Sequence, residues 1–274
     1  MKYMTFNSSC AFAGIANMLE DFGVDGIHMQ DYEIVLAMQL PYLFEHDSAL
    51  DAYATGISLQ SAVLFNRYLN TLGVNFAETL HERENVPQVL ETLTSRAMLP
   101  ILRKGGGKHA VIYLGSNNGE CTFLNNRRED STEPAELTFT ADALIDALHS
   151  PCPIGQLERC DVQTADYAPH YKASIAVLEK YRKALFDFCK KQRSFDEIDN
   201  AKHRLFRALV LDGLVMMELI GNGDMVALLK EIQKQFFAVL REKTGANLCE
   251  RLDFGLIERA IDGYIELILD NFTN

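Results

Sequence analysis

The first amphipathic segment of the chain lies near its start. Phe12, Ile15 and Leu19 recur at three- and four-residue spacing, which places them on one face of a helix. Gly23 follows the last residue of this pattern, and glycine commonly ends a helix. The pattern therefore predicts a helix from Cys10 to Gly23.

Residues 56–124 combine helical and extended patterns. The segment Gly56–Leu59 is expected to open a second helix that ends near Gly73, and a third helical stretch covers about 86–96. A short strand follows at 99–102. The apolar run after His109, the turn residues 116–119 and the apolar residues 121–124 together predict an antiparallel hairpin.

The periodicity changes in the last third of the chain. Residues 149–155 interrupt it with two prolines and a glycine, and a further loop is expected up to Pro169. Four helices are then predicted, with a capping box at Ser194 and Glu197; they cover about 171–191, 194–221, 223–245 and 248–271. We therefore expect an α+β domain over residues 1–165 and an all-helical bundle over residues 166–274.

Composition restricts the class of protein. No apolar run approaches the length of a membrane span, and no cleavable signal peptide is recognised. The six scattered cysteines fit reduced thiols, so a cytoplasmic location is expected. The net charge of −12 is concentrated in residues 1–165, which argues against binding nucleic acid. We expect no cofactor and no metal, since the histidines and cysteines near residues 149–170 fit no common zinc spacing.

Cys10 is the residue with the clearest chemical potential. It stands at the predicted start of a helix, where backbone N–H groups and the helix dipole favour a thiolate, and Asn7, Ser8 or Ser9 can cap the first turn. A cysteine on an amphipathic helix is also commonly a core residue. A nucleophilic role therefore requires a base elsewhere in the chain.

The predicted hairpin supplies such a base. His109 opens its first strand, and Asn125 and Asn126 close its second strand, so the histidine and one asparagine should lie opposite each other. Cysteine, histidine and asparagine are the set in which a thiol loses its proton to an imidazole that an amide orients. Because hairpin register is not fixed by sequence, either asparagine fits at this point.

The order of these features over residues 5–130 resembles the papain-like cysteine peptidases. Within them it is similar to the double-glycine leader peptidases and to butirosin acyltransferase-type proteins, which join a cysteine–histidine domain to a helical one. The resemblance implies a papain-like fold, with Cys10, His109 and Asn125 as the catalytic residues and Asn126 as the fallback for the third. The glutamine that the family commonly places before its cysteine is missing, and Asn7 is the nearby amide that could complete the oxyanion hole or, instead, cap the helix.

The expected activity is thiol-dependent acyl transfer on a peptide or a small amide or thioester. Water as acceptor gives a peptidase or amidase, and an amine gives an acyltransferase. A catalytically silent papain-like module that binds a peptide is the alternative from another class. The helical region is expected to govern substrate access or to form a homodimer, and its histidines, His170 and His203, are expected to have no catalytic role.

Overall fold

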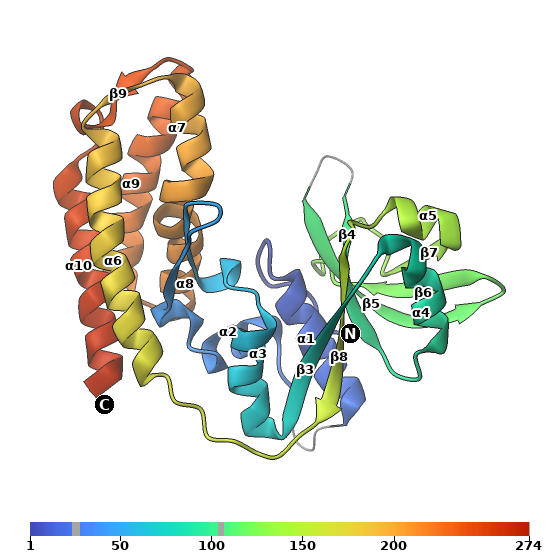
Figure 1. Ribbon diagram of the computed structural model, residues 1–274. Helices are drawn as coiled ribbons and strands as arrows, with labels where there is room; N and C mark the ends of the chain where they lie inside the picture. The colour runs from blue at the N-terminus through green and yellow to red at the C-terminus, as the bar shows by residue number, and fades with distance from the viewer. Residues whose placement is uncertain (24–27, 104–106, 274) are drawn as a thin grey trace. The chain divides into compact units, whose positions relative to one another are not determined.

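The computed structural model describes residues 1–23, 28–103 and 107–273, and the chain divides into two compact units. The first unit consists of Met1–Met38 and Gln60–Ala165, and the second of Gln39–Leu59 and Asp166–Asn274 (Figure 1). The fold is mixed α/β with a helical C-terminal region, as predicted at that level. Gly105 and Gly106 of the glycine run before His109 lie outside the described residues.

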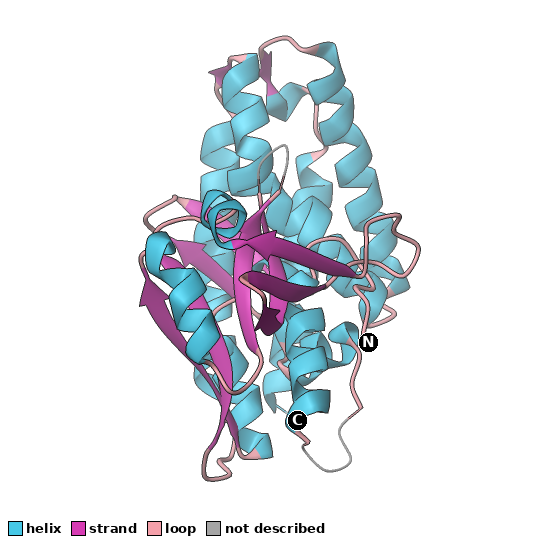
Figure 2. Cartoon of the chain, turned by 90° about the vertical axis from the view of Figure 1, so that its right-hand side faces the viewer, coloured by secondary structure: helices cyan, strands magenta, loops and turns pink. Residues whose placement is uncertain are grey.

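A six-stranded antiparallel sheet is the centre of the first unit, with strand order β3-β8-β4-β5-β6-β7. Its strands are β3 (Val74–His81), β4 (Ala97–Leu102), β5 (Lys108–Asn117), β6 (Glu120–Asn125), β7 (Glu136–Thr140) and β8 (Cys152–Arg159). The helices of this unit are α1 (Cys10–Phe22), α2 (Asp31–Ala37), α3 (Ala62–Leu69), α4 (Val86–Thr92) and α5 (Ala141–Asp146). Figure 2 shows the sheet with helices beside it.

Side-chain alternation divides the sheet into two faces. Leu99 and Val111, which are paired across β4 and β5, join a buried cluster with apolar residues of α4 and α5. The side chain of Ala110 lies on the opposite face of the sheet, where it packs against Cys10 and Ala13 of α1. The helix that begins at Cys10 is therefore placed over the start of β5.

Several local predictions differ from the structure. The predicted loop over 149–155 is wrong from Cys152 onward, because β8 lies between β3 and β4 with Cys152 and Ile154 buried. Proline and glycine are unfavourable in strands, so the sequence of this segment does not indicate one. The strand forms because it is buried between the neighbouring strands β3 and β4. Gly56–Ser58 is a 3₁₀ turn, and α3 begins only after Ser61, whose hydroxyl accepts a hydrogen bond from the N–H of Leu64.

Gly155 on β8 offers a test of this packing. A Cβ atom at this position would lie 2.0 Å from Cζ of Phe76, whose ring is buried against Phe65. We expect Gly155→Ala to lower the free energy of unfolding by about 1–3 kcal/mol, measured by urea denaturation. Gly223→Ala, whose Cβ would meet no atom within 4 Å, is the control and should leave stability unchanged or slightly higher. An unchanged midpoint for Gly155→Ala would contradict the packing.

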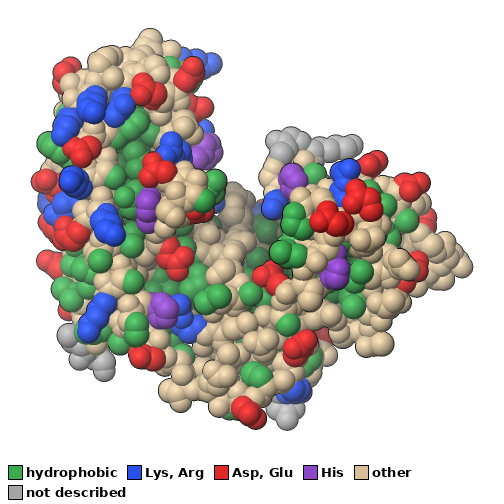
Figure 3. Space-filling model, in the orientation of Figure 1, with side chains coloured by type: hydrophobic (Ala, Val, Ile, Leu, Met, Phe, Trp, Pro, Cys, Tyr) green, Lys and Arg blue, Asp and Glu red, His purple; other side chains and the backbone are tan. Residues whose placement is uncertain are grey.

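The second unit contains the long C-terminal helices and a hairpin from the N-terminal half. The helices are α6 (Ala168–Cys189), α7 (Phe195–Ala201), α8 (Leu214–Leu219), α9 (Gly223–Glu242) and α10 (Phe254–Thr273). The short strands are β1 (Phe44–Asp47), β2 (Ala52–Thr55), β9 (Gln192–Arg193) and β10 (Ala246–Asn247). Figure 3 shows Lys and Arg interspersed with Asp and Glu over this unit, in keeping with the 16 Lys and Arg and 17 Asp and Glu of residues 166–274.

The predicted helix over 194–221 is continuous in outline but irregular. It begins with the expected capping box, in which Ser194 and Glu197 each bond the other's backbone N–H. Two π-helical runs, Lys202–Phe206 and Ala208–Gly213, then separate α7 from α8. The last helix begins at Phe254, later than expected, because Leu248–Glu250 forms a 3₁₀ turn. Within the described parts of the chain, no helix is long and apolar enough to cross a membrane.

The segment Gln39–Leu59 departs from the predicted division at residue 165. It belongs to the second unit, because β1 is fastened to the helices there. The N–H of Phe44 donates to the hydroxyl of Ser174 at 2.9 Å, and the Phe44 ring packs edge-on against Tyr264 at 4.9 Å between centroids. The first unit is therefore discontinuous in sequence.

Candidate active site

Cys10 is the first residue of α1, as the sequence predicts. Ser9 is the N-cap residue, but its hydroxyl does not cap the helix. It lies instead within hydrogen-bond distance of the Phe6 carbonyl, at 2.8 Å, and of the Asp31 carboxylate, at 2.5 Å. The first-turn N–H groups of α1, including that of Cys10, therefore have no side-chain cap.

Asp31 fixes the loop that precedes this helix. Its buried carboxylate accepts hydrogen bonds from the N–H and the hydroxyl of Thr5, at 2.7 and 2.5 Å, and from the hydroxyl of Ser9. It also accepts one from the N–H of Tyr32, at 2.8 Å. Asp31 was not predicted as a site residue, and its one signal in the sequence is that an aspartate begins the short segment 31–37. Asp31 therefore fixes the position of the loop that leads into α1, and with it the position of Cys10.

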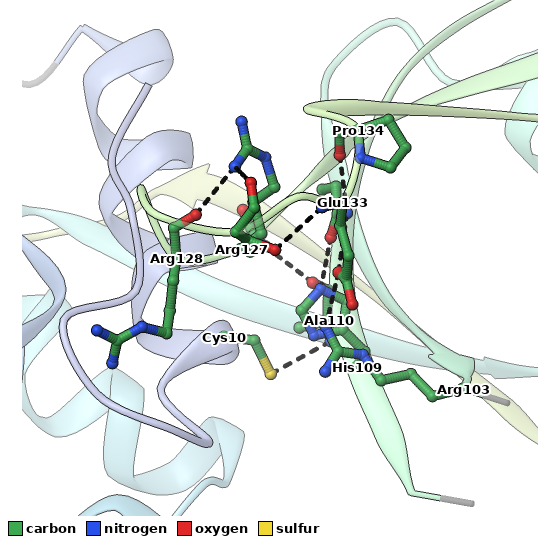
Figure 4. A network of polar contacts seen from close by, with 11 residues as sticks. Cys10, Arg103, His109, Ala110, Arg127, Arg128, Glu133 and Pro134 are labelled. Atoms are coloured by element: carbon green, nitrogen blue, oxygen red, sulfur yellow. Dashed lines mark hydrogen bonds and ion pairs between the residues drawn. The ribbon is translucent and has the colours of Figure 1, made fainter. Parts of the chain in front are cut away.

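The sulfur of Cys10 is directed toward the start of β5. It accepts a hydrogen bond from the N–H of Ala110 at 3.4 Å, and Figure 4 shows this contact beside His109. Burial raises the pKa of the Cys10 thiol, and the backbone N–H groups of Ala110 and Ala11 only partly oppose this effect. The expectation that the helix start favours a thiolate is therefore outweighed, and the resting residue is a thiol.

His109 and Asn125 are joined as the triad prediction requires. Nε2 of His109 lies 2.7 Å from Oδ1 of Asn125, and both side chains are buried. The amide of Asn125 is oriented by Nδ2, which donates to the Pro134 carbonyl at 2.9 Å. Oδ1 is thus the atom that faces the ring, so Nε2 carries the proton and Nδ1 is left as the basic nitrogen.

Charged groups surround this pair. Oε2 of Glu133 accepts from Nδ2 of Asn125 at 3.4 Å and from Nη2 of Arg103 at 3.0 Å (Figure 4). Burial, with a smaller contribution from the Arg103 charge, lowers the pKa of His109 below its usual value. The imidazole is therefore neutral at neutral pH. Neither Arg103 nor Glu133 was recognised from sequence, since neither belongs to a motif.

The described contacts do not include a hydrogen bond between Cys10 and His109. The sulfur accepts instead from the backbone N–H of Ala110, the residue that follows His109 on β5. The structure thus joins two members of the predicted triad directly and brings the third to the adjacent residue. Resting sites often have such loose geometry.

The two other predicted amides lie outside this arrangement. Nδ2 of Asn126 donates to the carbonyl of Ala110 at 3.1 Å, and its Oδ1 accepts from Asn17 of α1 at 3.4 Å. Asn126 therefore ties the hairpin to the helix and does not face His109. Asn7 is exposed, and within the described residues its side chain makes no hydrogen bond, whether as a cap or otherwise.

A cavity of about 180 Å³ opens beside Cys10. Its walls come from the start of α1 and α3 and from one face of the sheet, and they include Gln60, Phe65, Glu78, Met98 and Lys108. Burial raises the pKa of the Glu78 carboxyl, which forms no ion pair within the described residues. The thiol therefore borders a small, partly polar pocket of a size that suits a side chain or a short acyl group.

Comparison with known proteins gives no match, either to a family model or to a curated protein.

The raised pKa of Cys10 predicts how its reactivity depends on pH. Thiolate is the reacting form, so the rate of alkylation by iodoacetamide should still increase by about tenfold or more between pH 8 and pH 10, beyond any step from His109. The rate is best measured with Cys160 and Cys249 replaced by serine, because these two thiols are partly exposed. Cys152 can be left in place, because burial raises its pKa to about 11. The same protein with Cys10→Ser gives the background. A rate independent of pH from 7 to 10 would mean that a thiolate is already formed at neutral pH.

Proposed function

We propose that this protein is a thiol-dependent acyl-transfer enzyme, in the first place a cysteine peptidase or amidase, with Cys10 as nucleophile, His109 as base and Asn125 as the residue that orients the base. The hydrogen bond between His109 and Asn125 is the observation that carries the proposal. It fixes one tautomer of a buried neutral imidazole within one residue of the thiol's own hydrogen-bond partner. A histidine with a purely structural role would not need both a fixed tautomer and a position next to the hydrogen-bond partner of a thiol.

The proposed reaction has two stages. Nδ1 of His109 takes the proton of the Cys10 thiol as the sulfur forms a bond to the substrate carbonyl carbon. The imidazolium then gives that proton to the leaving amine or thiol, the bond to the leaving group breaks, and an acyl-cysteine remains. In the second stage His109 deprotonates the acceptor, which attacks the acyl carbon and releases the Cys10 thiolate, and the imidazolium returns its proton to the sulfur.

The acceptor decides between two outcomes. Water completes hydrolysis, as in the papain-like peptidases that the sequence resembles. An amine would complete acyl transfer, as in the butirosin acyltransferase-type proteins, and one observation favours this second candidate. Glu78 places a carboxylate without an ion-pair partner, within the described residues, on the wall of the Cys10 cavity, where it can attract an ammonium group.

Acylation of Cys10 by p-nitrophenyl acetate tests the common step. We expect a burst of p-nitrophenolate and an acetyl group on Cys10, located by peptide mass spectrometry, with both lost in Cys10→Ser. Adding glycinamide then separates the outcomes, because an acyltransferase would form N-acetylglycinamide, whereas a hydrolase would release acetate. Acetylation of another cysteine in preference to Cys10 would contradict the proposal.

A further inference from the structure

In the proposed reaction His109 becomes a buried cation when it takes the proton of the Cys10 thiol. The residue is 3% exposed, and its Nε2–H donates to the neutral amide oxygen of Asn125. Burial disfavours a charged imidazolium, and a neutral acceptor offsets this only in part. The proton transfer is therefore favoured by any negative charge that acts on the ring.

The loop between β6 and β7 places such a charge behind the amide of Asn125. Each hydrogen of its Nδ2 has an acceptor, one in the carbonyl of Pro134 at 2.9 Å and the other in Oε2 of Glu133 at 3.4 Å (Figure 4). A reversed amide would bring Oδ1 against both acceptors. The two contacts therefore hold Oδ1 toward His109.

This amide can transmit the effect of the carboxylate to the ring. Hydrogen bonds in a chain polarise one another, so a bond donated to a carboxylate increases the negative charge on the amide oxygen. The path from Oε2 of Glu133 to Nε2 of His109 consists of two hydrogen bonds, of 3.4 and 2.7 Å, through the side chain of Asn125. Burial lowers the pKa of His109, and the charge of Glu133 acts in the opposite direction.

Arg103, which follows β4, pairs with the same carboxylate. Its Nη2 lies 3.0 Å from Oε2 of Glu133, and both side chains are nearly half exposed, so solvent weakens this ion pair. The Arg103 charge acts to lower the pKa of His109 and also that of Cys10, the titratable group of α1 at this site. Arg103 and Glu133 are the charged groups that act on the His109 ring within the described residues, since Lys108, the preceding residue of β5, is exposed.

We infer that Glu133 is a positioning residue of the proposed reaction, whose carboxylate acts through the Asn125 amide to stabilise the imidazolium of His109. This inference rests on the proposed function. Glu133 holds the amide oxygen toward the ring and supplies negative charge as Nδ1 of His109 takes the proton from the sulfur. Arg103 neutralises part of that charge.

Removing one charge at a time separates this role from a structural one. The glutamine of Glu133→Gln can still accept from Nδ2 of Asn125 but carries no charge. We expect this variant to move the acid limb of Cys10 acylation by p-nitrophenyl acetate to lower pH, and to lower the plateau rate by about two- to fivefold. Arg103→Gln removes the opposing charge and should move the limb to higher pH. The double variant should have a limb close to that of the unmodified protein.

The pKa of His109 can also be measured without any reaction. A pH titration followed by ¹H–¹³C NMR of the imidazole C2–H groups gives this pKa, and the signal of His109 is the one that is absent from His109→Ala. Glu133→Gln should lower the pKa, because the imidazolium loses a negative charge. Arg103→Gln should raise it for the opposite reason.

Asp130 provides a matched control on the same loop. Its carboxylate pairs with Arg128 at 3.0 Å, whereas the hydrogens of the Asn125 amide bond Glu133 and Pro134. Asp130→Asn should therefore change neither the pKa of His109 nor the acylation rate.

Three results would overturn the inference: an unchanged pKa of His109 in Glu133→Gln, shifts of the same sign in Glu133→Gln and Arg103→Gln, or an unchanged plateau rate in Glu133→Gln. A different result tests the proposed function itself. If the pKa shifts are as expected but unmodified protein is acylated no faster than His109→Ala, the proposed function fails, and the effect of Glu133 on the imidazolium stands.

Discussion

Alanine in place of His109 is expected to lower the rate of Cys10 acylation by about 10²–10⁴-fold at neutral pH, the usual contribution of a general base. The reason is that burial keeps Cys10 protonated, so the thiol depends on a nearby base to react. The rate constant of p-nitrophenolate release under single-turnover conditions measures this effect directly.

The pKa of His109 determines how the acylation rate should depend on pH. Burial lowers that pKa, so the imidazole is the neutral base at pH 7 and becomes protonated only below its usual value of about 6.5. The acid limb of the acylation rate should therefore lie below pH 6.5 and should disappear in His109→Ala. As the pH rises far enough for the sulfur to ionise without a base, the difference between the variant and the unmodified protein should become smaller. A His109→Ala protein that keeps full activity at pH 7 would exclude this histidine as the base.

The elements around Cys10 and His109 follow from local sequence rules. Phe12, Ile15 and Leu19 define the face of α1, and Gly23 ends it in the left-handed conformation that glycine adopts readily. The hairpin of β5 and β6 is equally local, because its turn contains Asn118 and Gly119 with positive φ. Register then pairs Asn125 with Val111, and this pairing puts Asn125 on the face of His109 and Asn126 on the other.

The features that sequence did not predict depend on contacts between distant segments. β8 joins the sheet through pairing with β3, which is about 80 residues earlier in the chain. The hairpin of β1 and β2 packs with α6 through Ser174 and with α10 through Tyr264, and nothing local indicates this. Likewise, the proximity of Gln60 to Cys10 arises from a side chain that reaches across to Ser8. The pKa of Cys10 was misjudged for the same reason, since burial is a property of the whole fold.

Removal of the Asp31 carboxylate should have the largest effect on stability among the residues near Cys10. In Asp31→Ala the N–H of Thr5 and the buried hydroxyl of Ser9 lose a charged acceptor. Hydrogen bonds to charged groups contribute about 1.5–3 kcal/mol, so we expect the free energy of unfolding to fall by about 3 kcal/mol, measured by urea denaturation.

The same change should also slow acylation of Cys10 in the protein that remains folded, because Ser9 and Cys10 are adjacent and the start of α1 loses its support. Asp31→Asn keeps one acceptor oxygen but adds two donors where donors already converge, so it should recover only part of the stability. Asp142→Ala is a matched control, since Asp142 also lies in the first turn of a helix but is exposed, and it should cost less than about 0.5 kcal/mol. If Asp31→Ala were as stable as Asp142→Ala, the loop before Cys10 would be held by other contacts, and the precise placement of the nucleophile would no longer depend on α2.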